Sequence, residues 1–70
     1  MQFKKGQSVT ITLEGRTIDA KIILASKNNK SLAVSFDKMF CGYAGMMPIL
    51  YDDDKNYYKD LVEGRQLKIN

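Results

Sequence analysis

Residues 8–26, SVTITLEGRTIDAKIILAS, carry the clearest signal of secondary structure in the chain. Apolar and polar residues alternate in two runs, residues 8–13 and 16–26, which predicts two half-buried β-strands rich in β-branched side chains. Glu14-Gly15 separates the two runs, and a two-residue step that contains Gly is typical of a tight hairpin turn. The sequence therefore predicts a β-hairpin over residues 8–26.

The alternation continues beyond the hairpin into a third strand. Residues 27–30 contain two Asn residues, which favour turns because Asn tolerates the left-handed backbone. The third strand then places apolar side chains on the core side and small ones outward: Leu32, Val34 and Phe36 inward, Ala33 and Ser35 outward.

Residues 37–48 show no regular alternation of apolar and polar residues, so we expect an irregular loop there. Gly42 and Gly45 favour backbone angles that other residues avoid. The rest of the chain alternates short strands with turns: a strand at 49–51, a polar loop at 52–56, a return strand at 57–62, a turn at Glu63-Gly64 and a terminal pairing at 66–69. This spacing predicts an all-β barrel of about five antiparallel strands, with residues 1–70 as a single domain.

Three motifs in the first half of the chain resemble SH3-like barrels of the Tudor type. They are Gly6-x-x-Val9, the segment Glu14-Gly15-Arg16-x-Ile18-x-Ala20-Lys21-Ile22, and the strand Leu32-Ala33-Val34-Ser35-Phe36-Asp37. The resemblance implies a small SH3-like barrel. It does not extend to that family's aromatic cage for methylated Lys or Arg, because Gly42 and Tyr43 come late and in reverse order and residues 7–35 contain no aromatic side chain. The chain also resembles short bacterial proteins.

The amino-acid composition indicates a soluble globular protein and excludes several kinds of functional site. Of the 70 residues, 44% are hydrophobic and 27% are charged, which is typical of a soluble globular chain. One Cys and no His exclude a disulfide framework, a Cys/His zinc site and a histidine-based catalytic triad. No two acid–base candidates are tied by spacing, so we expect no enzyme activity and no cofactor.

Two further features have structural rather than functional interpretations. Cys41 has no His to activate it, so we expect a buried free thiol. Asp52-Asp53-Asp54 lacks the Gly and Glu that a calcium loop needs, so we expect a solvated loop and no metal. The chain shows no signal peptide and no apolar run long enough for a membrane helix. We therefore expect a cytoplasmic protein of bacterial or phage origin, with no membrane partner.

The uncharged stretch 39–51 is the main candidate for a binding surface. Met and aromatic side chains make adaptable contacts, so we expect a non-enzymatic interaction module that binds a protein or peptide here. The candidate partner-binding residues are Phe40, Tyr43, Met46, Met47 and Tyr51. Two alternatives remain for this stretch: a loop that plugs one end of the barrel, and a surface for homodimerisation.

A small RNA- or DNA-binding barrel is the alternative function. The chain has a net charge of +3, and seven of its eleven basic residues fall within residues 1–38. Lys21, Lys27 and Lys30 lie on or near one hairpin turn, and an exposed Tyr58 would stack on a base. A surplus of lysines also serves plain solubility.

Overall fold

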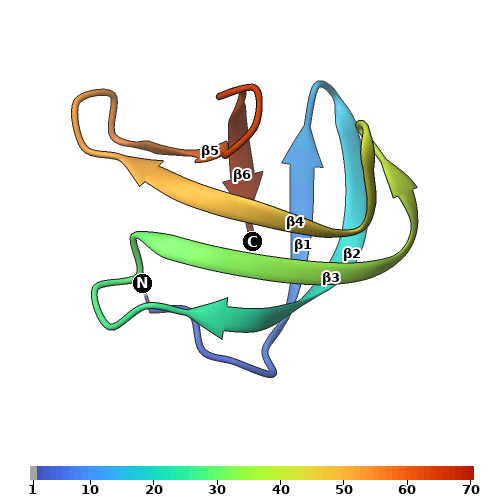
Figure 1. The fold of residues 1–70 in the computed structure, drawn as a ribbon, viewed down its shortest axis with the longest axis horizontal. Coiled ribbons are helices and arrows are strands. Elements are labelled where there is room, and N and C mark those ends of the chain that lie inside the picture. The colour runs from blue at the N-terminus through green and yellow to red at the C-terminus, as the bar shows by residue number, and fades with distance from the viewer. Residues whose placement is uncertain (1) are drawn as a thin grey trace.

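Six antiparallel β-strands make up the protein (Figure 1). The computed structural model describes residues 2–70. The strands are β1 (Ser8–Leu13), β2 (Arg16–Ala25), β3 (Ser31–Phe40), β4 (Tyr43–Asp52), β5 (Tyr57–Asp60) and β6 (Gln66–Ile69). Each strand pairs with the next and β6 pairs with β1, so the sheet closes into a barrel and the predicted all-β single domain is confirmed. Within residues 2–70, no helix is long and apolar enough to cross a membrane.

The β1–β2 hairpin forms as predicted. β1 pairs with β2 along its whole length. Glu14 and Gly15 have φ angles of 52° and 75°, the left-handed geometry that a type I′ hairpin turn requires at both positions. The apolar side chains of the alternating run, Val9, Ile11 and Leu13, are buried.

The irregular loop predicted over residues 37–48 is wrong, because this segment is a second hairpin. β3 continues to Phe40 and β4 begins at Tyr43. Cys41 and Gly42 form the turn between them, with φ angles of 49° and 93°. Cys41, which was predicted to be buried, is half-buried. A Cys in the left-handed region is uncommon, so the sequence carries no ordinary signal for this turn.

A bulge in β3 obscures the alternation of this second hairpin. The register between β3 and β4 shifts between Ser35 and Met39. Gly45, on the opposite strand, has a φ of 79°, and an added Cβ there would lie 3.6 Å from the carbonyl oxygen of Phe36. That distance is ordinary contact, so the backbone angle rather than lack of space favours glycine at this position.

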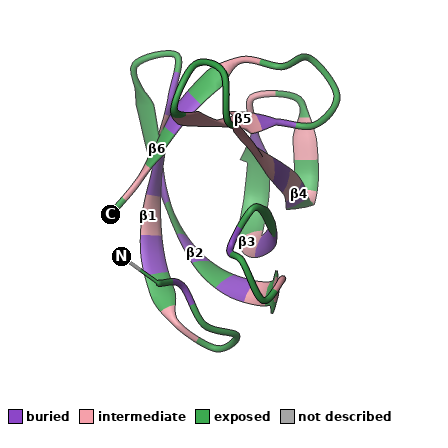
Figure 2. Ribbon diagram, turned by 90° about the vertical axis from the view of Figure 1, so that its left-hand side faces the viewer, coloured by how far each residue is buried: buried purple, intermediate pink, exposed green. Residues whose placement is uncertain are grey.

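The core fills the interior of the barrel. Ile11, Ile22, Val34 and Met47 are fully buried. Phe3, which precedes the first strand, packs into the same cluster. Figure 2 shows buried positions alternating with half-buried ones along β1 and with exposed ones along β2. A domain this small buries a modest fraction of its surface, so each of these side chains matters to its stability.

β2 turns one apolar residue of its alternating run outward. The alternation places Leu24 on the core side with Ile22, but Leu24 is 63% exposed. The register with β3 shifts between these two residues, and the extra residue of a bulge reverses the side chain that follows it. Ala33, which was predicted to point outward, is buried with 6% of its surface exposed, although it lies outside the core cluster.

The return strand predicted over residues 57–62 ends early, at Asp60. Leu61 and Val62 lie in a turn and are exposed. The Asp60 carboxylate accepts hydrogen bonds from the backbone N–H groups of Glu63 and Arg65. A side chain that bonds backbone groups a few residues ahead favours a turn, so the chain leaves the strand here.

Candidate interaction surfaces

The five residues predicted to bind a partner do not share one surface. Met47 is fully buried and Phe40 is 6% exposed, so both belong to the core. Tyr43 and Tyr51 are half-buried. Met46 alone of the five is exposed, with 51% of its surface accessible. The cause is the second hairpin, because neighbouring side chains on a strand point to opposite faces.

Tyr43 is held by a buried carboxylate. Its Oη donates a hydrogen bond to Asp60 Oδ2 at 2.7 Å and accepts one from the N–H of Val62 at 3.3 Å. Burial by itself would raise the pKa of Asp60, but hydrogen bonds from Tyr43, Arg65 and the backbone outweigh it and lower the pKa to about 2. Tyr43 therefore stabilises the turn after β5.

Arg65 completes this cluster at one end of the barrel. Its guanidinium group lies 3.3 Å from the carboxylate of Asp60 and 2.6 Å from that of Glu14. It also donates a hydrogen bond to the carbonyl oxygen of Cys41 at 3.0 Å. These partners come from β5, the β1–β2 turn and the β3–β4 turn, so one side chain links three segments that lie far apart in the sequence. Arg65 also lies 3.4 Å from the carboxylate of Glu63, so one cation is shared by three carboxylates.

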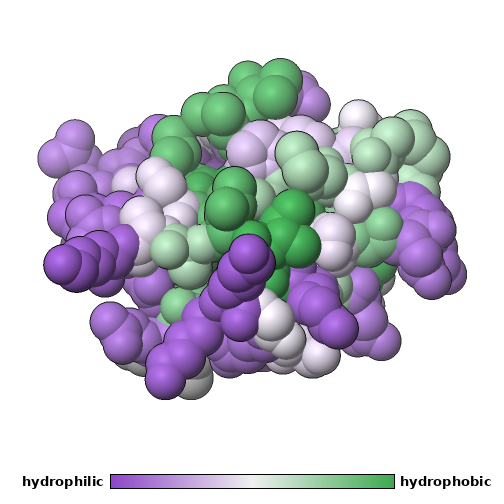
Figure 3. Space-filling view, turned by 60° about the horizontal axis from the view of Figure 1, so that its bottom comes forward, coloured by the Kyte–Doolittle hydropathy of each residue, from purple (hydrophilic) through white to green (hydrophobic). Residues whose placement is uncertain are grey.

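An uncharged hollow opens on the outer face of β2, β3 and β4. Its volume is ≈ 500 Å³, and none of its lining residues is charged or aromatic. We call it the apolar hollow and define it by Leu24, Ala33, Met46, Pro48, Leu50 and Leu61. Ser26 and Ser31 are the polar side chains in its lining. Figure 3 shows apolar side chains gathered across the centre and the upper edge of one face of the molecule.

Three large apolar side chains that line the apolar hollow are exposed to solvent. Leu24, Leu61 and Met46 are 63%, 53% and 51% exposed. Within residues 2–70, five large apolar residues have more than half of their surface exposed, and three of these five line the apolar hollow. Such gathering is typical of an interaction site. The sequence analysis missed Leu24 and Leu61, although the runs 22–24 and 61–62 both break strict alternation and could have indicated them.

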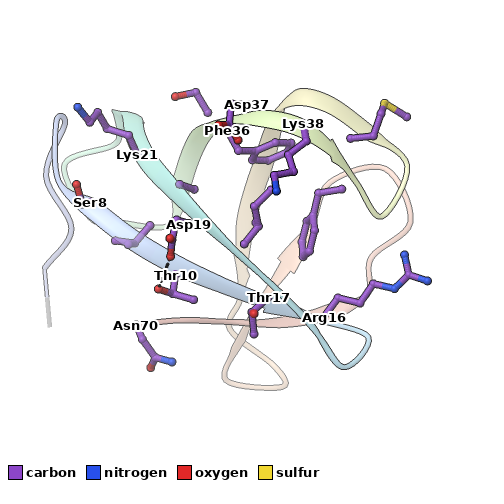
Figure 4. A pocket seen from close by; sticks show the side chains of 16 residues that line it. Ser8, Thr10, Arg16, Thr17, Asp19, Lys21, Phe36, Asp37, Lys38 and Asn70 are labelled. Carbon is purple, nitrogen blue, oxygen red and sulfur yellow. Dashed lines mark hydrogen bonds between the residues drawn. The ribbon is translucent and has the colours of Figure 1, made fainter.

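A second hollow lies where β2 and β3 separate. The two strands pair only as far as Lys21↔Ser35, although β2 begins five residues earlier and β3 continues five residues further. The space between them has a volume of ≈ 1340 Å³. Figure 4 shows Arg16, Lys21 and Lys38 around it. We call this space the β2–β3 cleft.

The three lysines of the alternative, nucleic-acid site have different surroundings. Lys30 Nζ forms an ion pair with Asp53 Oδ1 at 2.8 Å, and this pair raises the pKa of Lys30. Lys27 is exposed in the turn after β2. Lys21 lines the β2–β3 cleft. Only Lys27 of the three is therefore neither paired nor part of another candidate site.

Tyr58, the fourth residue of that site, packs within the protein. Its Oη donates a hydrogen bond to the carbonyl oxygen of Asn29 at 2.8 Å. Its ring makes edge contacts with Phe3 and Tyr51, with ring centroids 5.9 Å and 5.0 Å away. Burial raises the pKa of Tyr58, as expected for a phenol with little access to water. A base would have to displace these contacts to stack on the ring.

The acidic loop at residues 52–54 has a structural explanation. Asp52 Oδ1 accepts hydrogen bonds from the N–H groups of Asp54 and Lys55, and Asp52 Oδ2 lies 3.3 Å from Lys59 Nζ. The Lys55 N–H bond contributes most to lowering the pKa of Asp52. Across residues 2–70, no group of three or more His, Cys, Asp or Glu side chains is placed to hold a metal ion.

The closed antiparallel barrel is compatible with the SH3-like fold that the Tudor resemblance implies. No protein-family model matches the sequence, and neither a curated protein nor a solved structure matches it significantly. A fold by itself does not specify a function, so the two hollows are the features that bear on function.

Proposed function

We propose that this protein is a non-enzymatic interaction module that binds a protein partner through the apolar hollow. One observation carries the proposal: the hollow has no charged lining residue, in a chain of which 27% is charged. Burying an exposed Leu or Met side chain contributes about 1.5–3 kcal/mol. Leu24, Met46 and Leu61 together therefore offer the kind of central apolar anchor on which protein interfaces depend.

The chemistry of the hollow favours a folded protein that presents an uncharged, apolar ridge. Within residues 2–70, no cation lines the hollow to meet a phosphate or a carboxylate. β2, β3 and β4 are hydrogen-bonded to one another beneath it, so they leave few main-chain groups for an extended peptide. Met46 is unbranched and adapts to the shape of a partner. Of the two Ser residues in the lining, Ser26 already bonds Asn28 Oδ1 and the N–H of Ser31 through its hydroxyl, so the hydroxyl of Ser31 is the candidate to orient that partner.

The Tudor-type resemblance supports a role as an interaction module. Its aromatic cage is not part of the proposal, because no aromatic side chain lines the apolar hollow. Recognition of a methylated Lys or Arg depends on such a cage, since the cation must face aromatic rings. The proposed partner is therefore bound by its apolar surface, whatever its modification state.

Site-specific photocrosslinking in cells that express the protein tests this proposal. A photoreactive benzoylphenylalanine replaces Met46 in one variant and Val62 in another. Val62 is the control position, because it is apolar and 73% exposed but does not line the apolar hollow. We expect position 46 to form an adduct with a second protein, which mass spectrometry identifies, and position 62 to form no adduct with that protein.

Three outcomes would contradict the proposal. No adduct from position 46 would remove the apolar hollow as a binding surface. Equal crosslinking from positions 46 and 62 would indicate non-specific contact. Adducts formed only between two copies of this chain would make homodimerisation the role of the hollow, in place of a different partner.

A further inference from the structure

The backbone of β2 faces the β2–β3 cleft without a partner strand. In a two-residue hairpin, the residues that flank the turn exchange hydrogen bonds, and every second residue along the strand does the same. Arg16 flanks the β1–β2 turn and so bonds to β1. The main-chain groups of Thr17 and Asp19 then point away from β1, toward the cleft. Lys21 continues this alternation and does pair with β3.

β3 presents matching groups from the other side of the cleft. Phe40 flanks the β3–β4 turn and bonds to β4, so the main-chain groups of Met39 point toward β2. Ser35 pairs with β2, and Asp37 lies between Ser35 and Met39 in the bulge of β3. Outside the strand pairings, Thr17, Asp19, Asp37 and Met39 make no backbone hydrogen bond within residues 2–70. Two strand edges with free donors and acceptors therefore face one space.

The floor of the β2–β3 cleft is apolar. Ile18, Ala20 and Phe40 line it and are buried. Phe36 is half-buried and packs edge-on against Phe40, with ring centroids 6.0 Å apart. A strand laid along the cleft would turn every second side chain toward this floor, because the side chains of a strand alternate between its faces.

The rim of the cleft carries unpaired cations. Arg16, Lys21 and Lys38 are exposed, and no carboxylate within residues 2–70 forms an ion pair with any of them. Asp19 and Asp37 also lie at the cleft, but Asp19 already accepts a hydrogen bond from the neighbouring strand. That hydrogen bond leaves the charge of Asp19 in place, so three cations face two carboxylates, and the small positive excess at the rim favours acidic side chains on a ligand.

We propose that the β2–β3 cleft binds an extended peptide segment of a partner, in which apolar residues alternate with acidic ones. The main chain of that segment adds a strand to a free edge of β2 or β3, its apolar side chains pack on the floor, and its acidic side chains meet the rim. Strand addition of this kind takes its affinity from main-chain hydrogen bonds and its specificity from alternate side chains. The site is separate from the apolar hollow and does not depend on the function proposed for it.

Nuclear magnetic resonance titration with synthetic peptides tests this proposal. The probe is a short peptide in which Val and Glu alternate. One control peptide has the same sequence with a methylated backbone, which cannot pair as a strand. Another has Lys in place of Glu. We expect the Val-Glu peptide to slow amide hydrogen exchange about tenfold or more along the strand edge that it joins. That edge is Thr17 and Asp19 on β2, Asp37 and Met39 on β3, or both.

Charge-reversal variants test the rim. Lys38→Glu should weaken binding of the Val-Glu peptide about fivefold, because it replaces an attraction by a repulsion. Lys27→Glu is the control, since Lys27 is equally charged but does not line the cleft. It should change the affinity less than about twofold. A Leu61→Glu variant should bind the peptide as the wild type does, which separates this site from the apolar hollow.

The proposal is overturned by any of four results. These are no binding of the Val-Glu peptide, equal binding of the backbone-methylated peptide, equal binding of the Val-Lys peptide, and exchange protection confined to residues outside the cleft.

Discussion

Removing one oxygen atom from Tyr43 tests the buried cluster around Asp60. Tyr43→Phe deletes the 2.7 Å hydrogen bond to Asp60 and the acceptor for the N–H of Val62. Hydrogen bonds to charged groups contribute about 1.5–3 kcal/mol, and water has no access to the fully buried Asp60 to replace the lost one. We expect the free energy of unfolding, measured by urea denaturation at pH 7, to fall by about 2 kcal/mol.

The same carboxylate should make the wild-type protein sensitive to acid. The pKa of Asp60 is about 2 in the folded state, below its ordinary value of 3.8, so the unfolded chain takes up the proton more readily. The stabilisation is complete above pH 3.8 and is lost as the pH falls through 3.8 toward 2. One pKa unit corresponds to about 1.4 kcal/mol, so the loss is on the order of 2 kcal/mol. In Tyr43→Phe the pKa of Asp60 should rise and this loss should shrink.

Tyr51→Phe is the matched control for this experiment. Tyr51 is half-buried and contacts Tyr58, but its hydroxyl takes no part in the tyrosine hydrogen bonds found within residues 2–70. The control should change the free energy of unfolding by less than about 0.5 kcal/mol. Equal stability of the two variants would contradict this role of the Tyr43 hydroxyl, as would an equal loss of stability between pH 5 and pH 2 in the wild type and Tyr43→Phe.

Three further predictions concern the second hairpin and the alternative function. Met47→Ala should lower the free energy of unfolding by about 2–5 kcal/mol in urea, whereas Met46→Ala should lower it by less than about 0.5 kcal/mol, because only Met47 is in the core. Gly45→Ala should cost about 1–2 kcal/mol in thermal or urea unfolding, because its φ of 79° disfavours a Cβ; an unchanged midpoint would contradict this. A random single-stranded RNA and DNA pool should leave the amide shifts of residues 21–30 unchanged at low salt; shifts that vanish at high salt would instead favour nucleic-acid binding.

The first half of the fold could be predicted because its signals are local. Strict alternation and the Glu14-Gly15 step determine the β1–β2 hairpin, and both lie within one short stretch. The β3–β4 hairpin was missed because its turn uses Cys41 in a left-handed conformation and because the bulge after Ser35 breaks the period. A bulge depends on the strand opposite, which local pattern does not reveal.

The candidate sites depend on contacts between distant parts of the chain. The sequence analysis chose Tyr43 for its aromatic ring, but its hydroxyl bonds to Asp60, 17 residues away. The apolar hollow brings Leu24 and Leu61 together across three strands, because the bulge in β2 turns Leu24 outward and the turn after β5 exposes Leu61. Of the predicted partner-binding residues, Met46 is the one that remains in the proposed site.

If a protein partner binds at the apolar hollow, its affinity must depend on the side chains that line the hollow, and this affinity can be measured with the crosslinked partner. Isothermal titration calorimetry compares the wild type with Leu61→Glu and Val62→Glu, two neighbouring exposed positions of which only the first lines the hollow. Losing a buried Leu contact weakens binding by about 1.5–3 kcal/mol. We predict that Leu61→Glu raises the Kd about tenfold or more while Val62→Glu leaves it unchanged. Equal affinities for the three proteins would contradict the claim.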